Sequence, residues 1–100
     1  MIIGGIDKQP FEIEIIGIDF KLRVGAGETL STPVVTARDE ASGADTTGDV
    51  LSGDPVVAGT IVTQKVAAGT SGTRHIVQFR VPTSTGRAVE DELTLTVQEH

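Results

Sequence analysis

The chain has 100 residues, a formal net charge of −6, three aromatic residues and no cysteine. A chain of this length buries one core, so we expect a single domain over residues 1–100. Too few basic and aromatic side chains are present to neutralise phosphates and stack bases, so nucleic acid is not an expected partner. Without cysteine, neither disulfide bonds nor thiolate metal sites can form.

The first six residues, MIIGGI, place three isoleucines ahead of the first clear strand pattern. This run is much shorter than a signal-peptide core or the ~20 residues of a membrane-spanning helix, so we expect a cytosolic chain without membrane contact. Residues 1–7 form either an additional edge strand of the same sandwich or an arm that adds to a neighbour's sheet edge. In the second case Ile2, Ile3 and Ile6 are interaction residues.

In FEIEIIGIDFKLRV, residues 11–24, apolar residues alternate with other side chains, as is typical of a strand. The alternation changes parity at Ile15 and Ile16, beside Gly17. Such a change would move the apolar side chains to the other face of a sheet. The pattern therefore predicts two strand segments, separated by a bulge or by a crossing between sheets.

After a glycine turn, residues 30–39 predict a strand that Pro33 confines to a sheet edge or a bulge. Residues 39–55 are mostly small and acidic, and they predict an acidic loop with a short strand at 49–52 as its one regular element. The β-branched residues 56–66 predict one further strand.

The last third of the chain has the pattern of a β-hairpin. The segment RHIVQFRV alternates from residue 74 to 81, PTSTGR breaks it, and residues 89–97 alternate again. The second glycine turn, residues 67–73, precedes this pair. The pattern predicts a half-buried antiparallel hairpin with apolar side chains inside and polar side chains outside.

No window shows helical periodicity over ten residues, whereas strands recur every 8 to 12 residues between Gly and Pro turns. The sequence therefore predicts an all-β fold, most simply an immunoglobulin-like antiparallel β-sandwich of about seven strands in a single domain. A small barrel is the alternative.

Two titratable residues lie on apolar faces of the predicted hairpin. His75 is expected to be a packed or boundary histidine and not a catalytic base, and the other histidine, His100, is terminal. Asp91 interrupts the series of apolar residues on the inward face of its strand, residues 89–97. It is either a buried acid with a shifted pKa or a hydrogen-bonded residue at the rim, and we expect the rim position, with Arg80 or Arg87 as a structural partner.

The acidic loop carries five carboxylates that can offer oxygen ligands to calcium, but their spacing matches no EF-hand, and a solvated loop explains them equally well. They are Asp39, Glu40, Asp45, Asp49 and Asp54. No P-loop, dinucleotide fingerprint or zinc spacing is present. No constellation of nucleophile, base and orienting group is recognisable either, so we expect no enzyme, no cofactor and no catalytic or metal-binding residue.

Three blocks of the sequence together resemble a family of small tailed-phage and prophage virion proteins described as fiber-tail adaptors. DKQPFEIEIIGIDF is similar to the family's Lys-x-Pro and Ile-Asp-aromatic positions, here Lys8, Pro10 and residues 18–20. GETLSTPVVTA resembles its Gly-acid-Thr-apolar strand opening at residues 27–30. The last block, residues 67–97, is similar to its Gly-Thr-x-Gly-Thr turn, hairpin strand, Thr-x-x-Gly-Arg turn and acidic last strand, with His75 where the family usually has tyrosine.

The resemblance implies a non-enzymatic virion component in the neck, tail or fiber attachment region, assembled in the bacterial host cytoplasm and encoded by a phage or a prophage. It implies other virion proteins as partners and a homo-oligomer, with a symmetric ring as the natural assembly. The alternative from another class is a ligand-binding or adhesion-type sandwich that recognises a surface carbohydrate or protein through its loops. Sugar platforms usually need Trp or Tyr, and the chain has neither.

Overall fold

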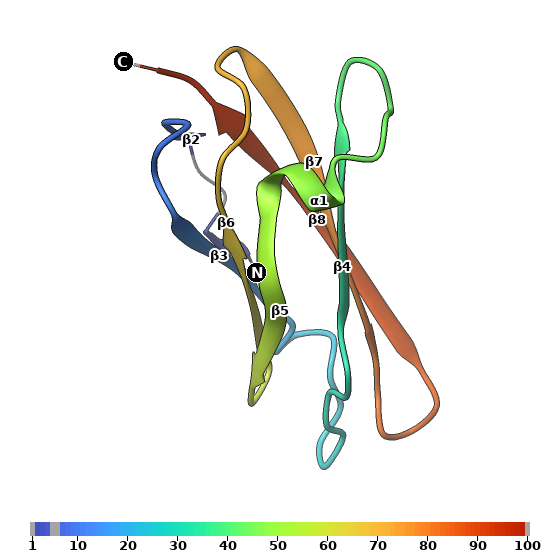
Figure 1. The fold of residues 1–100 in the computed structure, drawn as a ribbon. Coiled ribbons are helices and arrows are strands. Elements are labelled where there is room, and N and C mark those ends of the chain that lie inside the picture. The colour runs from blue at the N-terminus through green and yellow to red at the C-terminus, as the bar shows by residue number, and fades with distance from the viewer. Residues whose placement is uncertain (1, 5–6, 100) are drawn as a thin grey trace.

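In the computed structural model, residues 2–4 and 7–99 are described, with side chains from Asp7 onward, and they form two packed β-sheets (Figure 1). Sheet A has the strand order β1 (Ile2–Gly4), β3 (Glu14–Asp19), β6 (Ile61–Val66) and β5 (Leu51–Ala58). Sheet B has the order β2 (Asp7–Lys8), β8 (Ala88–Val97), β7 (Thr73–Pro82) and β4 (Val34–Asp39). The all-β prediction is confirmed, and the architecture is a sandwich, not a barrel.

The strand pairings are antiparallel with one exception among the described residues. Strand β2 pairs in parallel with β8, with Asp7 opposite Thr96 and Lys8 opposite Val97. The hairpin of β7 and β8 pairs ten residues in continuous register, from Thr73 opposite Val97 to Pro82 opposite Ala88. This is the hairpin that the alternation predicted.

The core lies between the two sheets and consists of side chains that alternate with outward residues along the strands. Apolar burial of this kind contributes about 25 cal/mol per Å² removed from water. The buried apolar residues are Ile16, Ile18, Phe20, Val35, Ala37, Val50, Val62, Val66, Val77, Phe79, Val81, Val89, Leu93, Leu95 and Val97.

The N-terminal strand β1 pairs antiparallel with β3, with Ile2 opposite Ile18. The backbone of residues 2–4 is therefore an edge strand of the same sandwich, which is one of the two alternatives predicted for residues 1–7. Ile6 and the side chains of Ile2 and Ile3 lie outside the described residues, so the interaction role of these three isoleucines stays a prediction.

The prediction of two strand segments in residues 11–24 was wrong, because only Glu14–Asp19 forms a strand. A turn precedes it, in which the Glu12 N–H donates to the Gln9 carbonyl at 3.0 Å and the Gln9 N–H donates to Glu12 Oε1 at 2.6 Å. A second turn follows it, in which the Arg23 N–H donates to the Phe20 carbonyl at 2.8 Å. The alternation of apolar residues therefore continues into both turns, although the strand itself covers only Glu14–Asp19.

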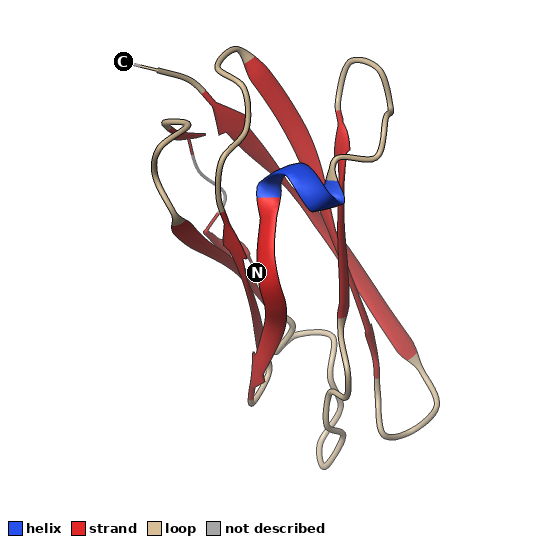
Figure 2. Cartoon of the chain, in the orientation of Figure 1, coloured by secondary structure: helices blue, strands red, loops and turns tan. Residues whose placement is uncertain are grey.

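Two further predictions on the middle of the chain need correction. Within the acidic loop predicted at 39–55, the short strand predicted at 49–52 is confirmed in part by the start of β5 at Leu51, but the one-turn helix α1 (Thr47–Val50) was not predicted (Figure 2). A four-residue helix is too short to show periodicity, and its buried Val50 is its one link to the core. The single strand predicted at 56–66 is instead the end of β5 and the whole of β6, joined at Gly59, whose φ of 64° suits a tight turn.

The prediction for β4 is confirmed. The strand begins directly after Pro33 and forms one edge of sheet B. In the described part of the chain, no helix is long and apolar enough to cross a membrane.

Candidate interaction surface

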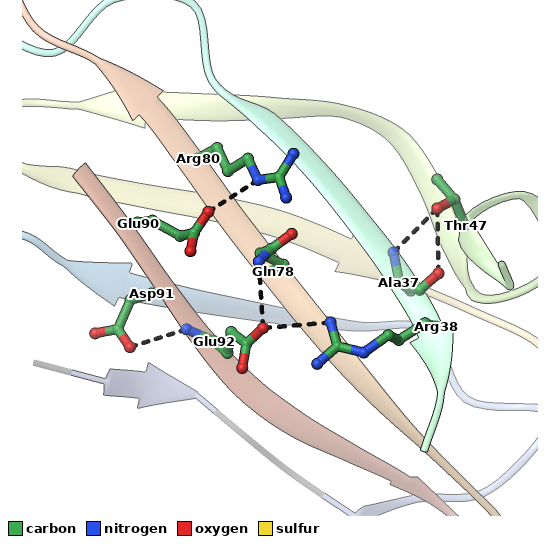
Figure 3. Close-up of polar contacts among 8 residues, drawn as sticks. All are labelled: Ala37, Arg38, Thr47, Gln78, Arg80, Glu90, Asp91 and Glu92. Carbon is green, nitrogen blue, oxygen red and sulfur yellow. Dashed lines mark hydrogen bonds and ion pairs between the residues drawn. The ribbon is translucent and has the colours of Figure 1, made fainter. Parts of the chain in front are cut away.

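Ion pairs on the outer face of sheet B join β8 to β7 and, across β7, to β4 (Figure 3). Arg80 Nε lies 2.9 Å from Glu90 Oε1, and Arg38 Nη1 lies 3.2 Å from Glu92 Oε2. The Gln78 amide donates to the same Glu92 oxygen at 3.3 Å. These pairs are exposed and individually weak, but they leave this face polar and internally matched in charge.

The outer face of sheet A carries more exposed apolar side chains, although Val34 on the outer face of sheet B is also 54% exposed. Ile13, Ile15 and Val56 are 64%, 63% and 58% exposed. The register places Ile15 beside Lys65 of β6, and Val56 beside Thr63. We call the outward side chains of these five residues the apolar face. Ile15 and Val56 lie on either side of β6, with Thr63 and Lys65 between them. Several exposed apolar side chains on one face mark a contact site more often than single exposed residues do.

Phe11 adds to the exposed apolar surface just before this face in the chain. The sequence has three phenylalanines: Phe20 and Phe79 are fully buried, whereas Phe11 is 97% exposed. Phe11, Ile13 and Ile15 share one parity, opposite to the buried Ile16 and its successors. The parity change seen in the sequence was the signal for this surface.

A hollow of about 270 Å³ opens on the apolar face where β5 bulges away from β6. Ile15, Val56, Lys65 and Asp54 are among its lining residues. The buried Gln64 holds the bulge from inside, because its amide nitrogen donates to the carbonyl oxygens of Ser52, Gly53 and Lys65 at 3.2, 3.1 and 3.0 Å. The hollow is therefore a fixed feature of the sheet, supported by a satisfied buried polar group.

The longer edge strands are poorly suited to adding a strand from another molecule. On β5 the bulge interrupts the edge, and it contains Pro55, which has no N–H to donate. On β4 the outward backbone groups of Ala37 are already bound: its N–H donates to Thr47 Oγ1 at 3.0 Å, and its carbonyl accepts from the Thr46 N–H at 2.9 Å. These contacts favour the sheet faces as docking surfaces.

The edge of β8 is blocked by Asp91. The Gln98 N–H donates to the Lys8 carbonyl, so even-numbered residues of β8 direct their backbone groups to the β2 side, and Glu92 is one of them. The Glu92 N–H donates to Asp91 Oδ1 at 2.8 Å. Asp91 is half-buried and hydrogen-bonded, as predicted for a rim position.

The predicted arginine partners of Asp91 were wrong, because each arginine lies nearer another carboxylate. Arg80 pairs with Glu90, as described above, and Arg87 Nη1 lies 2.8 Å from Glu28 Oε1. Side chains at odd and even positions of a strand point to opposite faces, which separates Asp91 from Arg80.

His75 is buried, as predicted, and both of its ring nitrogens are bound by hydroxyl groups. Thr73 Oγ1 donates to the Thr70 carbonyl at 2.6 Å, so it accepts from His75 Nε2–H at 3.0 Å, and Thr46 Oγ1 donates to Nδ1 at 2.9 Å. Burial lowers the pKa of His75 below its usual 6.5, although the Asp39 and Asp49 carboxylates oppose this change. The neutral ring thus ties the start of β7 to the segment before α1.

Glu28 joins two of the sequence blocks that carry the family resemblance. Its carboxylate accepts hydrogen bonds from the Gly25 N–H at 2.8 Å, from the Thr85 hydroxyl and from Arg87. The hydrogen bond from Gly25 and those from the Thr83 and Thr85 hydroxyls lower the pKa of Glu28 from 4.5 to about 2. The Gly-acid-Thr block and the Thr-x-x-Gly-Arg turn therefore form one structural cluster.

The lysine of the first block is also structural. Lys8 is fully buried, and its Nζ donates to the carbonyl oxygens of Gln9 and Pro10 at 2.8 and 3.3 Å. Burial lowers the pKa of Lys8, while the carboxylates of Glu12 and Glu14 oppose this change. Lys8 thus holds the turn before β3, from which Phe11 projects.

Two carboxylates of the acidic segment, those of Asp39 and Asp45, stabilise turns of the backbone. Asp39 Oδ1 accepts from the N–H groups of Ala41 and Ser42 at 2.9 and 3.0 Å, and Asp45 Oδ1 accepts from the Thr47 N–H at 2.9 Å. Asp and Asn commonly stabilise turns in this way. In the described part of the chain, His, Cys, Asp and Glu side chains form no group of three or more that could hold a metal ion.

Over residues 8–96 the chain matches the family model described as podophage GP4 fiber-tail adaptor protein gp77. The chain belongs to this family of phage structural adaptors, which confirms the resemblance seen in the sequence. No curated protein sequence matches the chain.

Proposed function

We propose that this protein is a non-enzymatic adaptor of a phage or prophage particle, which assembles through protein–protein contacts in the neck, tail or fiber attachment region. Membership of the adaptor family over residues 8–96 supports an adaptor role and a place in the virion. Other virion proteins are its partners, copies of the chain associate with one another, and the particle is assembled in the host cytoplasm.

The observation that carries this proposal is the contrast between the two outer faces. On sheet B, Arg38 and Arg80 are matched by carboxylates of the same chain, and among the described residues Val34 is the one large apolar side chain of this sheet that is more than half exposed. On sheet A, Ile13, Ile15 and Val56 remain more than half exposed. Burying one such side chain completely contributes about 1.5–3 kcal/mol, so a protein that covers this face gains from each of the three.

We further propose that the sandwich is immunoglobulin-like. The order β1-β3-β6-β5 corresponds to the A-B-E-D sheet of an immunoglobulin domain. The order β8-β7-β4 corresponds to its G-F-C sheet, with β2 as a short additional strand beside G. In this arrangement the whole of 1–100 is one domain, and the apolar face belongs to the A-B-E-D sheet.

The N-terminal isoleucines provide a second contact in this proposal. Strand β1 has three residues and its pairing with β3 shifts register between Ile2 and Gly4, so few ladder hydrogen bonds hold it. Ile2, Ile3 and Ile6 contact a neighbouring virion protein along this edge of sheet A. Short edge strands with unpaired backbone groups are the usual sites of strand addition.

The test is incorporation of a surface variant into particles. In a phage that carries the gene, Ile13→Thr, Ile15→Thr and Val56→Thr together should leave the purified protein folded but remove it from purified virions on an immunoblot. The matched control is Leu22→Thr and Val34→Thr, which changes exposed apolar residues outside this face and should be incorporated like the wild type. Equal incorporation of both variants would contradict the role given to the apolar face.

A further inference from the structure

The apolar face carries one basic and one acidic side chain beside the same hollow. Lys65 and Asp54 both line it, with Ile15 and Val56 as its apolar walls. Lys65 lies between Ile15 and Ser52 in the register of β3, β6 and β5. Among the described residues, neither Lys65 nor Asp54 has an ion-pair partner, whereas Arg38, Arg74, Arg80 and Arg87 each have one.

We propose that the apolar face binds the apolar face of a second copy of this chain, with Lys65 of each copy opposite Asp54 of the other. Two copies related by a two-fold axis present the same surface to each other. If Lys65 of one copy contacts Asp54 of the other, the same contact therefore occurs a second time with the two copies exchanged. A face with one unpaired cation, one unpaired anion and apolar side chains around them satisfies this condition. This inference rests on the proposed function, and it names a second copy of the chain as the molecule that covers the apolar face.

Shape and hydrogen bonding agree with a contact between faces. Gln64 fixes the bulge that forms the hollow, so the hollow is present before any partner arrives. The exposed Ile15 stands at its margin and can enter the hollow of the other copy. Pre-formed complementary surfaces bind with little ordering cost. The blocked edges of β4, β5 and β8 disfavour pairing of the copies through their strands.

The outer face of sheet B and the edge of β8 are poor partners for Lys65 and Asp54. On sheet B, the carboxylates of Glu90 and Glu92 are already engaged by Arg80 and Arg38. At the edge of β8 the residues 90–92 are all acidic, so Asp54 of another copy would meet like charges there. Like charges brought together across an interface suppress association.

The experiment is sedimentation equilibrium of the purified full chain over a dilution series at 0.15 M salt, where charges more than about 8 Å apart are largely screened. The wild type should form a reversible dimer. Lys65→Glu and Asp54→Lys should each weaken dimerisation at least tenfold, because each brings like charges together twice. The double variant with both changes should recover most of the loss, and Lys21→Glu, outside the face, should dimerise like the wild type.

A wild type that stays monomeric at every concentration would overturn the inference, and so would a double variant as weak as the single ones. Circular dichroism of each variant shows whether it is folded before its mass is interpreted. A monomeric protein that is still found in purified virions would refute this pairing and leave the adaptor function standing, so the two failures are distinguishable.

Discussion

At the scale of single residues, Glu28 shows how a carboxylate connects segments far apart in the sequence. Its side chain is almost fully covered, and it binds the turn at Gly25 on one side and the hairpin turn at Thr85 and Arg87 on the other. Because these contacts stabilise the charged form, the pKa of Glu28 in the folded chain lies at about 2, well below the ordinary 4.5. Linkage then makes the stability of the fold depend on pH.

The stability contributed by Glu28 should be fully present above pH 4.5 and should be lost as the pH falls from 4.5 toward 2. Glu28→Gln should lower the melting temperature at pH 7, because Arg87 loses its partner, and the difference from the wild type should shrink toward pH 2. Thermal unfolding followed by circular dichroism between pH 2 and 7 measures this. Glu99→Gln, at an exposed position, should follow the wild type. A constant gap between Glu28→Gln and the wild type over this range would contradict the account.

Single residues differ in how far the sequence could predict them. The burial of His75 and the rim position of Asp91 follow from strand parity, which is a local property. The partner of Arg87 does not, because Glu28 lies 59 residues away and reaches it only through the packing of two turns. The exposure of Ile13 and Ile15 was visible as a parity change, but parity alone does not say which of the two faces is buried.

At the scale of elements, the edge of β8 is kept from adding strands by Asp91 and Arg23. Strand β2 pairs only with Thr96 and Val97, and beyond them no strand of the described residues pairs with this side of β8. Asp91 occupies the Glu92 N–H, and Arg23 Nη1 lies 3.4 Å from the Glu90 carbonyl. Inward-pointing charged residues on edge strands are a known means of preventing association between sheets.

Asp91→Val should therefore open this edge, because valine favours strands and leaves the Glu92 N–H unbound. The expected result is a species larger than that of the wild type in sedimentation velocity at equal concentration, with at least a tenfold tighter self-association. Asp91→Asn is the matched control, since its side-chain oxygen still accepts from the Glu92 N–H. Identical sedimentation of Asp91→Val and the wild type would show that Asp91 does not block the edge.

Elements with long alternation were predictable, and elements with short or mixed signals were not. The β7–β8 hairpin follows from alternation over residues 74–81 and 89–97 on the two sides of a turn, because register is fixed wherever one face is buried. The boundary between β5 and β6 was missed, since Gly59 and Thr60 turn the chain within a continuous β-branched stretch. Helix α1 has four residues, fewer than any helical period can reveal.

At the scale of the whole molecule, the two sheets have the same number of strands but different outer surfaces. The outer face of sheet B carries matched charges, as expected of a solvent-exposed face. The outer face of sheet A carries Ile15 and Val56 at a hollow that Lys65 and Asp54 also line, and Ile13 is exposed just before β3. The all-β class and the family were predictable from the sequence, because both rest on local patterns and their order along the chain. The location of the interaction surface depends on how strands 14–19, 51–58 and 61–66 align, which the sequence did not reveal.

The central claim, that this chain is a structural component of a virion, is tested most directly by quantitative mass spectrometry of purified particles of a phage that carries the gene. The account predicts the chain in a fixed number of copies per particle in complete virions, and its absence from heads that lack tails. Purified complete virions that do not contain the chain, prepared from cells that express it, would contradict the account.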